Sequence, residues 1–295
     1  MGSGHSHAPA TFQRAFRIGI AINLMFVGVE AFFGWKINSL ALLADAGHNL
    51  SDVAGLLLAW GGVFVSRLAA TDRHTYGFRK VTILAAFANA MLLLVAMGSL
   101  GWEALNRFRS PQPIEGWTMI WVATSGIVIN SLTAMLFWKG NHHDINIRGA
   151  FLHMVADAAV SAGVVAAGVL ALVFGWIWID PVLSIVIAIV IIVGTWNLLR
   201  QSLTLLFDGV PHHMDLAAIR ECLRSLPGVE RICDLHVWAM GTDQIALTAH
   251  LIRPGAYPDD SFFLSAEREL HDRFEIEHVT LQVMQSAVDG PRAIV

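Results

Sequence analysis

The sequence predicts a membrane-embedded bundle of six α-helices followed by a C-terminal cytoplasmic α+β domain. Hydrophobic residues make up 55% of the 295-residue chain and charged residues only 14%, a composition too apolar for an ordinary soluble protein. The charges are also unevenly placed. Long apolar runs dominate the first two thirds of the chain, whereas short alternating runs with many charges follow the stretch "DGVPHHMD" at residue 208.

Six apolar runs are each long enough to cross the membrane, because ~30 Å of hydrocarbon requires a helix of about 20 residues. These runs lie near residues 14–35, 39–66, 80–105, 116–138, 149–174 and 178–207. We therefore expect a flexible N-terminal tail over residues 1–13, a transmembrane domain over 14–207 and a cytoplasmic domain over 208–295.

The orientation of the spans follows from the basic residues near their ends. Three lie on one side, Lys36, Arg107 and Arg109. The other side carries Arg14, Arg17, Arg67, Arg73, Arg79, Lys80, Lys139, Arg148 and Arg200. The positive-inside rule predicts that the richer side is cytoplasmic, which also places both termini in the cytoplasm.

Residues 208–295 predict a small αββαβ domain of the ferredoxin-like type. Helical periodicity covers residues 215–226 and 261–274, and alternating patterns predict strands over 230–240, 244–253 and 277–285. This order favours a small sheet with helices on one face. Strict alternation places Asp234, His236 and Trp238 on the opposite face from Cys233, Leu235 and Val237. It also places His250 and His278 on polar faces, where they favour either a metal site or a dimer contact, or are simply solvated.

Two matching motifs stand inside the apolar runs. In "LLADAGHNLSDVAG", Asp45, His48 and Asp52 are three and four residues apart, so on a helix they share one face. The fifth span repeats the pattern with His153 and Asp157, four residues apart.

Acids in the middle of a membrane must be stabilised by something. Asp52 and Asp157 together would cost on the order of 5–7 kcal/mol if they were unpaired. Each His–Asp pair could serve only to join helices through hydrogen bonds. Because two spans carry the same spacing, we favour a functional role.

The chemistry that these side chains indicate is metal binding. The imidazoles of His48 and His153 and the carboxylates of Asp52 and Asp157 provide four N/O ligands, the number that tetrahedral Zn²⁺ accepts. Two carboxylates also balance its charge, and Asp45 is a supporting candidate. Spans 2 and 5 would run antiparallel, as expected if spans 1–3 and 4–6 form an inverted repeat.

Other polar residues in the spans leave two interpretations open. Asn23, Glu30, Asn89 and Asn130 could line a water-filled path or could form hydrogen bonds between helices. Glu103 is expected to pair with Arg107, four residues further along.

Several stretches, in this order, resemble the cation diffusion facilitator family, specifically its zinc-transporting branch. They are "SLALLADAGHNLSD", "RHTYGFRKVTILAAFANA", "LHMVADAAVSAGVV", "DGVPHHMDL" and "DLHVWAM". The resemblance covers nearly the whole chain. It implies a homodimer in the bacterial inner membrane that exports Zn²⁺, and often Cd²⁺, in exchange for protons. It transfers the metal role to His48, Asp52, His153 and Asp157.

The resemblance also implies a regulatory zinc site in the C-terminal domain, at His250 and His278. Here Cys233 stands where some relatives place a histidine before "DL". We therefore include Cys233, Asp234 and His236 as candidate ligands of this second site.

Other classes of function fit the sequence less well. A net charge of −4 without a basic patch argues against nucleic acid as a partner. An intramembrane metalloenzyme would be expected to carry a motif such as HExxH and an open zinc position, not four protein ligands. A passive metal channel would hold ions weakly at several sites, whereas one four-ligand site suits alternating access.

Overall fold

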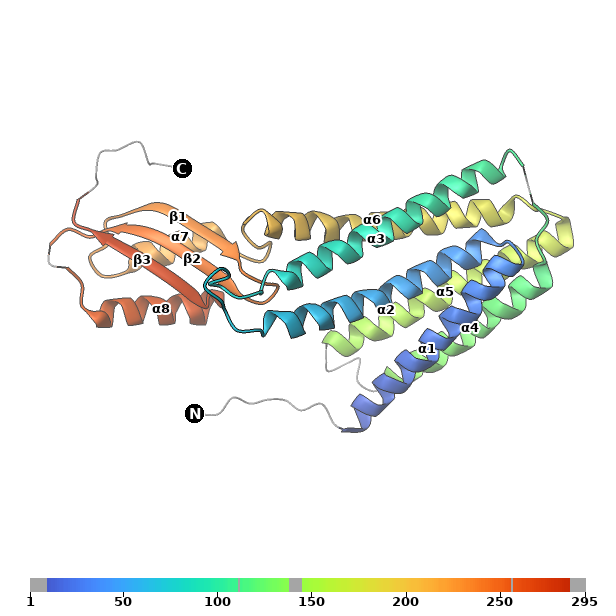
Figure 1. Cartoon of the computed structure of the whole chain (residues 1–295), viewed down its shortest axis with the longest axis horizontal. Helices are drawn as coiled ribbons and strands as arrows, with labels where there is room; N and C mark the ends of the chain where they lie inside the picture. Colours follow the sequence, from blue (N-terminus) through green and yellow to red (C-terminus); the bar gives the residue numbers. More distant parts are fainter. Residues whose placement is uncertain (1–9, 111, 138–144, 256, 287–295) are drawn as a thin grey trace. The chain divides into compact units, whose positions relative to one another are not determined.

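The computed structural model describes residues 10–110, 112–137, 145–255 and 257–286 (Figure 1). The chain divides into two compact units. The first contains the chain up to residue 56 together with residues 89–196, and the second contains residues 57–88 and the chain from residue 197 onward. The domain boundary expected near residue 208 stays a prediction.

Six long helices correspond to the six predicted spans. They are α1 Ala10–Lys36, α2 Leu40–Ser66, α3 Val81–Arg107, α4 Gly116–Phe137, α5 Ile145–Phe174 and α6 Ile179–Leu206. Helices α2 to α6 each contain a segment long and apolar enough to cross a membrane. Helix α1 begins at Ala10, earlier than expected, so the last part of the predicted flexible tail is helical. Residues 1–9, including "GHSH", lie outside the described part of the chain.

The core of the first unit joins four of its helices. The buried side chains of its main cluster are Ile37, Ala41, Leu42, Ala44, Met119, Val122, Ala123, Val164, Ala167 and Ile187. Helices α4 and α5 lie side by side, as do α1 and α4 (Figure 1). Small residues permit the first of these contacts, since a Cβ atom on Gly168 would lie 3.3 Å from the carbonyl oxygen of Gly116.

The start of α2 is held by residues remote in the sequence. Asn38 adopts a left-handed φ of 60°, which lets the chain turn between α1 and α2. The carboxylate of Asp180 on α6 accepts hydrogen bonds from the main-chain N–H groups of Leu40, at 2.9 Å, and Ala41, at 3.2 Å. It therefore satisfies donors that a helix N-terminus cannot satisfy internally, and it positions the helix that carries the first polar motif.

The C-terminal part of the second unit has the predicted αββαβ order. Its elements are α7 Leu216–Ser225, β1 Arg231–Ala239, β2 Ile245–Ile252, α8 Asp260–Phe274 and β3 His278–Met284. The strand order is β1-β2-β3, with β1 and β2 antiparallel and β2 and β3 parallel. Figure 1 shows α7 and α8 beside this sheet, and their apolar faces form one core with it.

Strand β1 departs from the strict alternation that we expected. Asp234 has a positive φ of 53°, and a β-bulge lies between Cys233 and His236. Cys233 is opposite His250, and His236 is opposite Thr248. Since Thr248 and His250 are two residues apart on β2 and share a face, Cys233 and His236 also share a face. The predicted assignment of Cys233 and His236 to opposite faces is therefore wrong, because a bulge adds a residue to one strand and shifts the side-chain period.

Candidate metal centre

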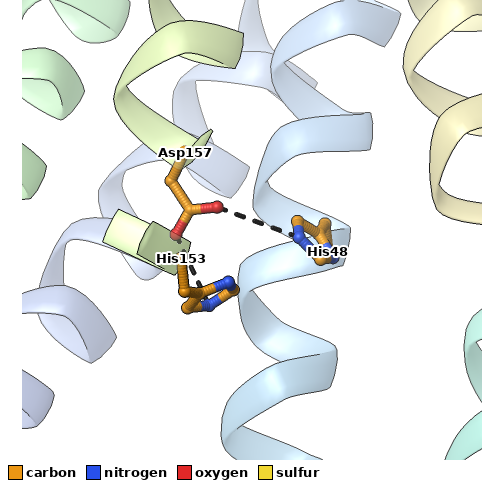
Figure 2. Close-up of side chains that lie close together, drawn as sticks. All are labelled: His48, His153 and Asp157. Atoms are coloured by element: carbon orange, nitrogen blue, oxygen red, sulfur yellow. Dashed lines mark ion pairs between the residues drawn. The ribbon is translucent and has the colours of Figure 1, made fainter. Parts of the chain in front are cut away.

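Helical spacing brings the two polar motifs together in the first unit. His48 and Asp52 are one turn apart on α2, and His153 and Asp157 are one turn apart on α5. Figure 2 shows His48 pointing toward Asp157 and His153 from the neighbouring helix. The four predicted ligands therefore converge, although they come from two distant segments of the chain.

The distances between donor atoms are short in every His–Asp combination. The Nε2 atom of His153 lies 3.2 Å from Oδ2 of Asp52 and 3.5 Å from Oδ2 of Asp157. The Nε2 atom of His48 lies 3.7 Å from Oδ2 of Asp52 and 3.9 Å from Oδ1 of Asp157. Each carboxylate thus faces both imidazoles, so the pairs are shared between the helices.

These separations fit the edges of a small coordination polyhedron. A tetrahedral Zn²⁺ ion with ligands at 2.0–2.1 Å has edges of about 3.3 Å. One ligand atom each from His48, His153 and Asp157 lies within 4.8 Å of the others. Oδ2 of Asp52, Oδ2 of Asp157 and Nδ1 of His48 are buried and have no hydrogen-bond partner among the described residues. A cation would satisfy the two carboxylate oxygens, while Nδ1 of His48 points elsewhere.

The ligands differ in their exposure to the surroundings of the bundle. The side chain of Asp157 is only 3% exposed, whereas those of Asp52 and His153 are 35% and 40% exposed. His48 is intermediate at 23%. The group therefore has a buried side at Asp157 and an accessible side at Asp52 and His153.

Asp45 lies about one turn before His48 on α2 and is not one of the four candidate metal ligands. It is 1% exposed and accepts hydrogen bonds from Ser161 at 3.1 Å and from Asn49 at 3.5 Å. The hydrogen bond from Ser161 on α5 links the two motif helices one turn beyond the ligands. Asp45 thus lies beside the candidate site, and its supporting role stays a prediction.

The remaining polar residues of the spans have varied surroundings. Glu30 and Asn130 are buried, and a Cβ atom on Gly55 would meet the side chain of Asn89. The side chain of Asn23 lies outside the described residues. The predicted pair of Glu103 and Arg107 is present, at 3.5 Å.

The candidate ligands of the C-terminal domain form a second, looser group. Asp234 lies 2.8 Å from Nε2 of His236 and 3.6 Å from Nδ1 of His250, with Cys233 opposite His250 on the adjacent strand. His278 is separate from them. It pairs with Ala246 at the opposite end of β2, and its ring lies 5.6 Å from that of Tyr76.

The anchor of α2 was missed by sequence reasoning. Asp180 is fully buried and accepts a hydrogen bond from the Ser39 hydroxyl as well as from the helix N-terminus. Arg107 donates to the main-chain and side-chain oxygens of Asn38 in the same turn. The sequence shows Asp180 only as a single acid at the start of an apolar run. Acids are common in the first turn of a helix, so this position did not indicate a contact with α2.

Family comparisons agree with this architecture over most of the chain. A family model described as "Cation efflux transmembrane domain" matches residues 16–207, and one described as "Cation efflux protein, cytoplasmic domain" matches residues 211–285. The chain belongs to the cation diffusion facilitator family. It is accordingly an integral membrane protein of a family of cation efflux transporters, and not an enzyme.

Named relatives of this cation diffusion facilitator span nearly its full length. It is 35% identical to the zinc transporter ZitB of Escherichia coli, over 99% of this chain and 95% of the relative. It is 34% identical to the metal cation efflux system protein CzcD of Cupriavidus metallidurans, over 96% of this chain and 90% of the relative. It is 31% identical to the cadmium, cobalt and zinc/H(+)-K(+) antiporter of Bacillus subtilis, over 99% of this chain and 95% of the relative.

Proposed function

We propose that this protein exports Zn²⁺, and also Cd²⁺, from the cytoplasm in exchange for protons by alternating access. The observation that carries the proposal is the convergence of His48, Asp52, His153 and Asp157 from α2 and α5, with N–O separations of 3.2–3.9 Å. Mixed imidazole and carboxylate donors suit Zn²⁺ better than Mg²⁺ or Ca²⁺, which prefer oxygen ligands alone. The names of the relatives support the same class of substrate.

Proton exchange follows from the ligand chemistry. An imidazole must be deprotonated to bind a metal, so protons and Zn²⁺ compete for His48 and His153. If the site opens to each side in turn, Zn²⁺ displaces protons on the cytoplasmic side, and protons from the other side displace Zn²⁺. Zn²⁺ and the protons exchanged for it therefore bind the same side chains at different times.

The setting that we propose for this exchange is a homodimer in the bacterial inner membrane, with both termini in the cytoplasm. The distribution of basic residues supports the orientation. The match of residues 211–285 to the cytoplasmic domain of cation efflux proteins supports a cytoplasmic C-terminal domain.

A flux assay separates exchange from passive conduction. The purified protein is reconstituted into lipid vesicles that contain a zinc-sensitive dye. Zn²⁺ uptake into the vesicles is then followed with and without a pH gradient. An exchanger accelerates zinc uptake when the lumen is more acidic than the outside, and it alkalinises the lumen as zinc enters, because protons leave in exchange. Zinc flux that ignores the pH gradient would favour the channel alternative and overturn the exchange mechanism.

We also propose that Asp234, His236 and His250, with Cys233 opposite His250, bind a regulatory Zn²⁺ ion. The test uses the full chain carrying Asp157→Asn, so that the membrane site is disabled, and measures residual zinc by equilibrium dialysis. His250→Ala is expected to remove this residual zinc. His278→Ala should retain it, because His278 lies at the other end of β2. Equal loss in both variants would contradict this ligand set.

A further inference from the structure

A second group of acids lies beside the metal ligands but outside them. Glu30 on α1 is completely buried, and Asp45 on α2 is 1% exposed. The carboxyl group of Glu30 faces that of Asp45, with the amide of Asn49 beside both. Two buried carboxyl groups therefore meet at the junction of α1, α2 and α5.

The hydrogen bonds of this group are incomplete. Ser161 and Asn49 donate to the two oxygens of Asp45. Neither oxygen of Glu30 has a hydrogen-bond partner among the described residues. As carboxylates, Glu30 and Asp45 are both acceptors, so they cannot bond to each other. A single proton between them would supply the missing donor.

Among the described residues, the charged groups that act on Glu30 and Asp45 include no lysine or arginine. Asp157 on α5 acts on both acids with the same negative sign, and His48 on α2 is the titratable base near Asp45. Helix α4, which packs against α1, has no titratable residue between Gly116 and Phe137. Among the described residues, Asp45 forms its hydrogen bonds with Ser161 and Asn49 and none with a metal ligand.

We propose that Glu30 and Asp45 form a proton-binding site in which the two carboxyl groups share one proton at neutral pH. Two buried carboxylates in contact repel each other strongly, and neighbouring acids in this position retain one proton between them. The shared proton also joins α1 to α2 through an O–H···O⁻ hydrogen bond, which is short and strong. This site goes beyond the proposed function, since it does not depend on which ion the protein transports.

Infrared spectroscopy measures the proton directly, because a protonated carboxyl group and a carboxylate absorb at different carbonyl frequencies. The full chain is purified without metal and examined in lipid at neutral pH. Glu30→Gln is expected to remove about one protonated carboxyl per chain, since the Gln amide donates to Asp45 and leaves it ionised. Asp45→Asn should remove the same band, because the Asn amide donates to Glu30 and leaves it ionised. It provides a second variant if the first does not fold.

The matched control is Glu103→Gln, the same substitution at an exposed acid that pairs with Arg107. It should leave the band unchanged. The proposal is overturned if the wild-type protein shows no protonated carboxyl at neutral pH, or if the band persists in both Glu30→Gln and Asp45→Asn.

A pH titration of stability distinguishes the shared proton from a merely structural role for Glu30. The folded protein would hold one more proton than the unfolded chain, so its stability should fall as pH rises. In Glu30→Gln the donor is permanent, and the thermal midpoint should fall less between about pH 6 and about pH 9. Parallel pH profiles for the wild type and Glu30→Gln would contradict the proposal.

Discussion

At the scale of single residues, each carboxylate of the candidate metal site faces both histidines. Oδ2 of Asp52 lies within 3.7 Å of Nε2 of His48 and 3.2 Å of Nε2 of His153. Asp157 makes the equivalent approaches from the buried side. The loss of either acid would therefore remove one ligand and half of the negative charge that balances Zn²⁺.

We expect Asp157→Asn and Asp52→Asn each to abolish zinc transport and to weaken zinc binding at this site at least ~10- to 100-fold. Both substitutions retain the size of the side chain, so the effect reports charge and coordination. Calorimetry and vesicle flux provide the measurement, with Glu103→Gln as the control. Near-normal flux in either variant would remove that residue from the ligand set.

Cys222 provides a residue-scale probe of the C-terminal domain. It is 2% exposed, and burial, together with the Glu269 carboxylate, raises the pKa of its thiol. The folded state therefore keeps this thiol protonated at pH values where the unfolded chain loses the proton. The resulting contribution to stability is present below the ordinary thiol pKa of about 8.5 and is lost as pH rises above it.

We expect Cys222 to react slowly with alkylating reagents in the native protein, because the thiolate is the reactive form. The Cys233→Ser variant leaves Cys222 as the single cysteine, so its labelling can be followed by mass spectrometry. Labelling should be slow at neutral pH, should accelerate as pH rises, and should become rapid in denaturant. Equally fast labelling of native and unfolded protein would show that Cys222 is not buried.

At the scale of elements, the N-terminus of α2 is held by α6. Asp180 accepts hydrogen bonds from Leu40, Ala41 and Ser39, which makes the start of α2, the helix that carries His48 and Asp52, part of the same core as α6. His48 and Asp52 lie two to three turns further along α2, so the anchor contributes to their position.

Asp180→Ala is expected to destabilise the protein by about 1–3 kcal/mol, because it leaves buried N–H and hydroxyl donors without an acceptor. Thermal unfolding in detergent, followed by tryptophan fluorescence, checks this value. Ser184→Ala is the control, since Ser184 is buried on the same helix but donates only to the main-chain oxygen of Asp180. A wild-type midpoint for Asp180→Ala would mean that α2 is not anchored in this way.

In the C-terminal domain, the β-bulge in β1 positions the candidate ligands, as the anchor at Asp180 does for α2. It moves Cys233 to the side of His236 and opposite His250, whereas a regular strand would separate Cys233 from His236. The proposed regulatory site therefore depends on one irregular position, Asp234, and not on the alternation of the strand.

At the scale of the whole molecule, the proposed transport cycle requires that zinc affinity respond to pH. An imidazole must be deprotonated to bind a metal, so protons compete with zinc for both histidines. Zinc binding should therefore weaken as pH falls from about 7.5 to about 6, and binding should release protons.

Calorimetry in buffers of different ionisation enthalpy measures this release. The protein should carry His250→Ala, so that the C-terminal site does not contribute. A release of zero protons across the range would refute proton coupling at His48 and His153, even in a protein that still transports zinc.

The sequence by itself determined the features that depend on near neighbours in the chain. Apolar runs predicted the long helices, and spacings of three and four residues predicted which side chains share a face of α2 and α5. The αββαβ order was likewise readable, because helical and strand periods differ over a few residues. Family resemblance extended these local patterns to the four candidate ligands in the membrane.

Only the tertiary structure decided which distant residues meet. The contact of Asp180 with Leu40 spans 140 positions of the chain, and the hydrogen bond from Ser161 to Asp45 spans 116. The proximity of Glu30 to Asp45 and the separation of His278 from His250 were equally absent from the local pattern. Periodicity constrains the face on which a side chain lies. The partner opposite that face depends on how helices and strands pack, which is set by contacts along the whole chain.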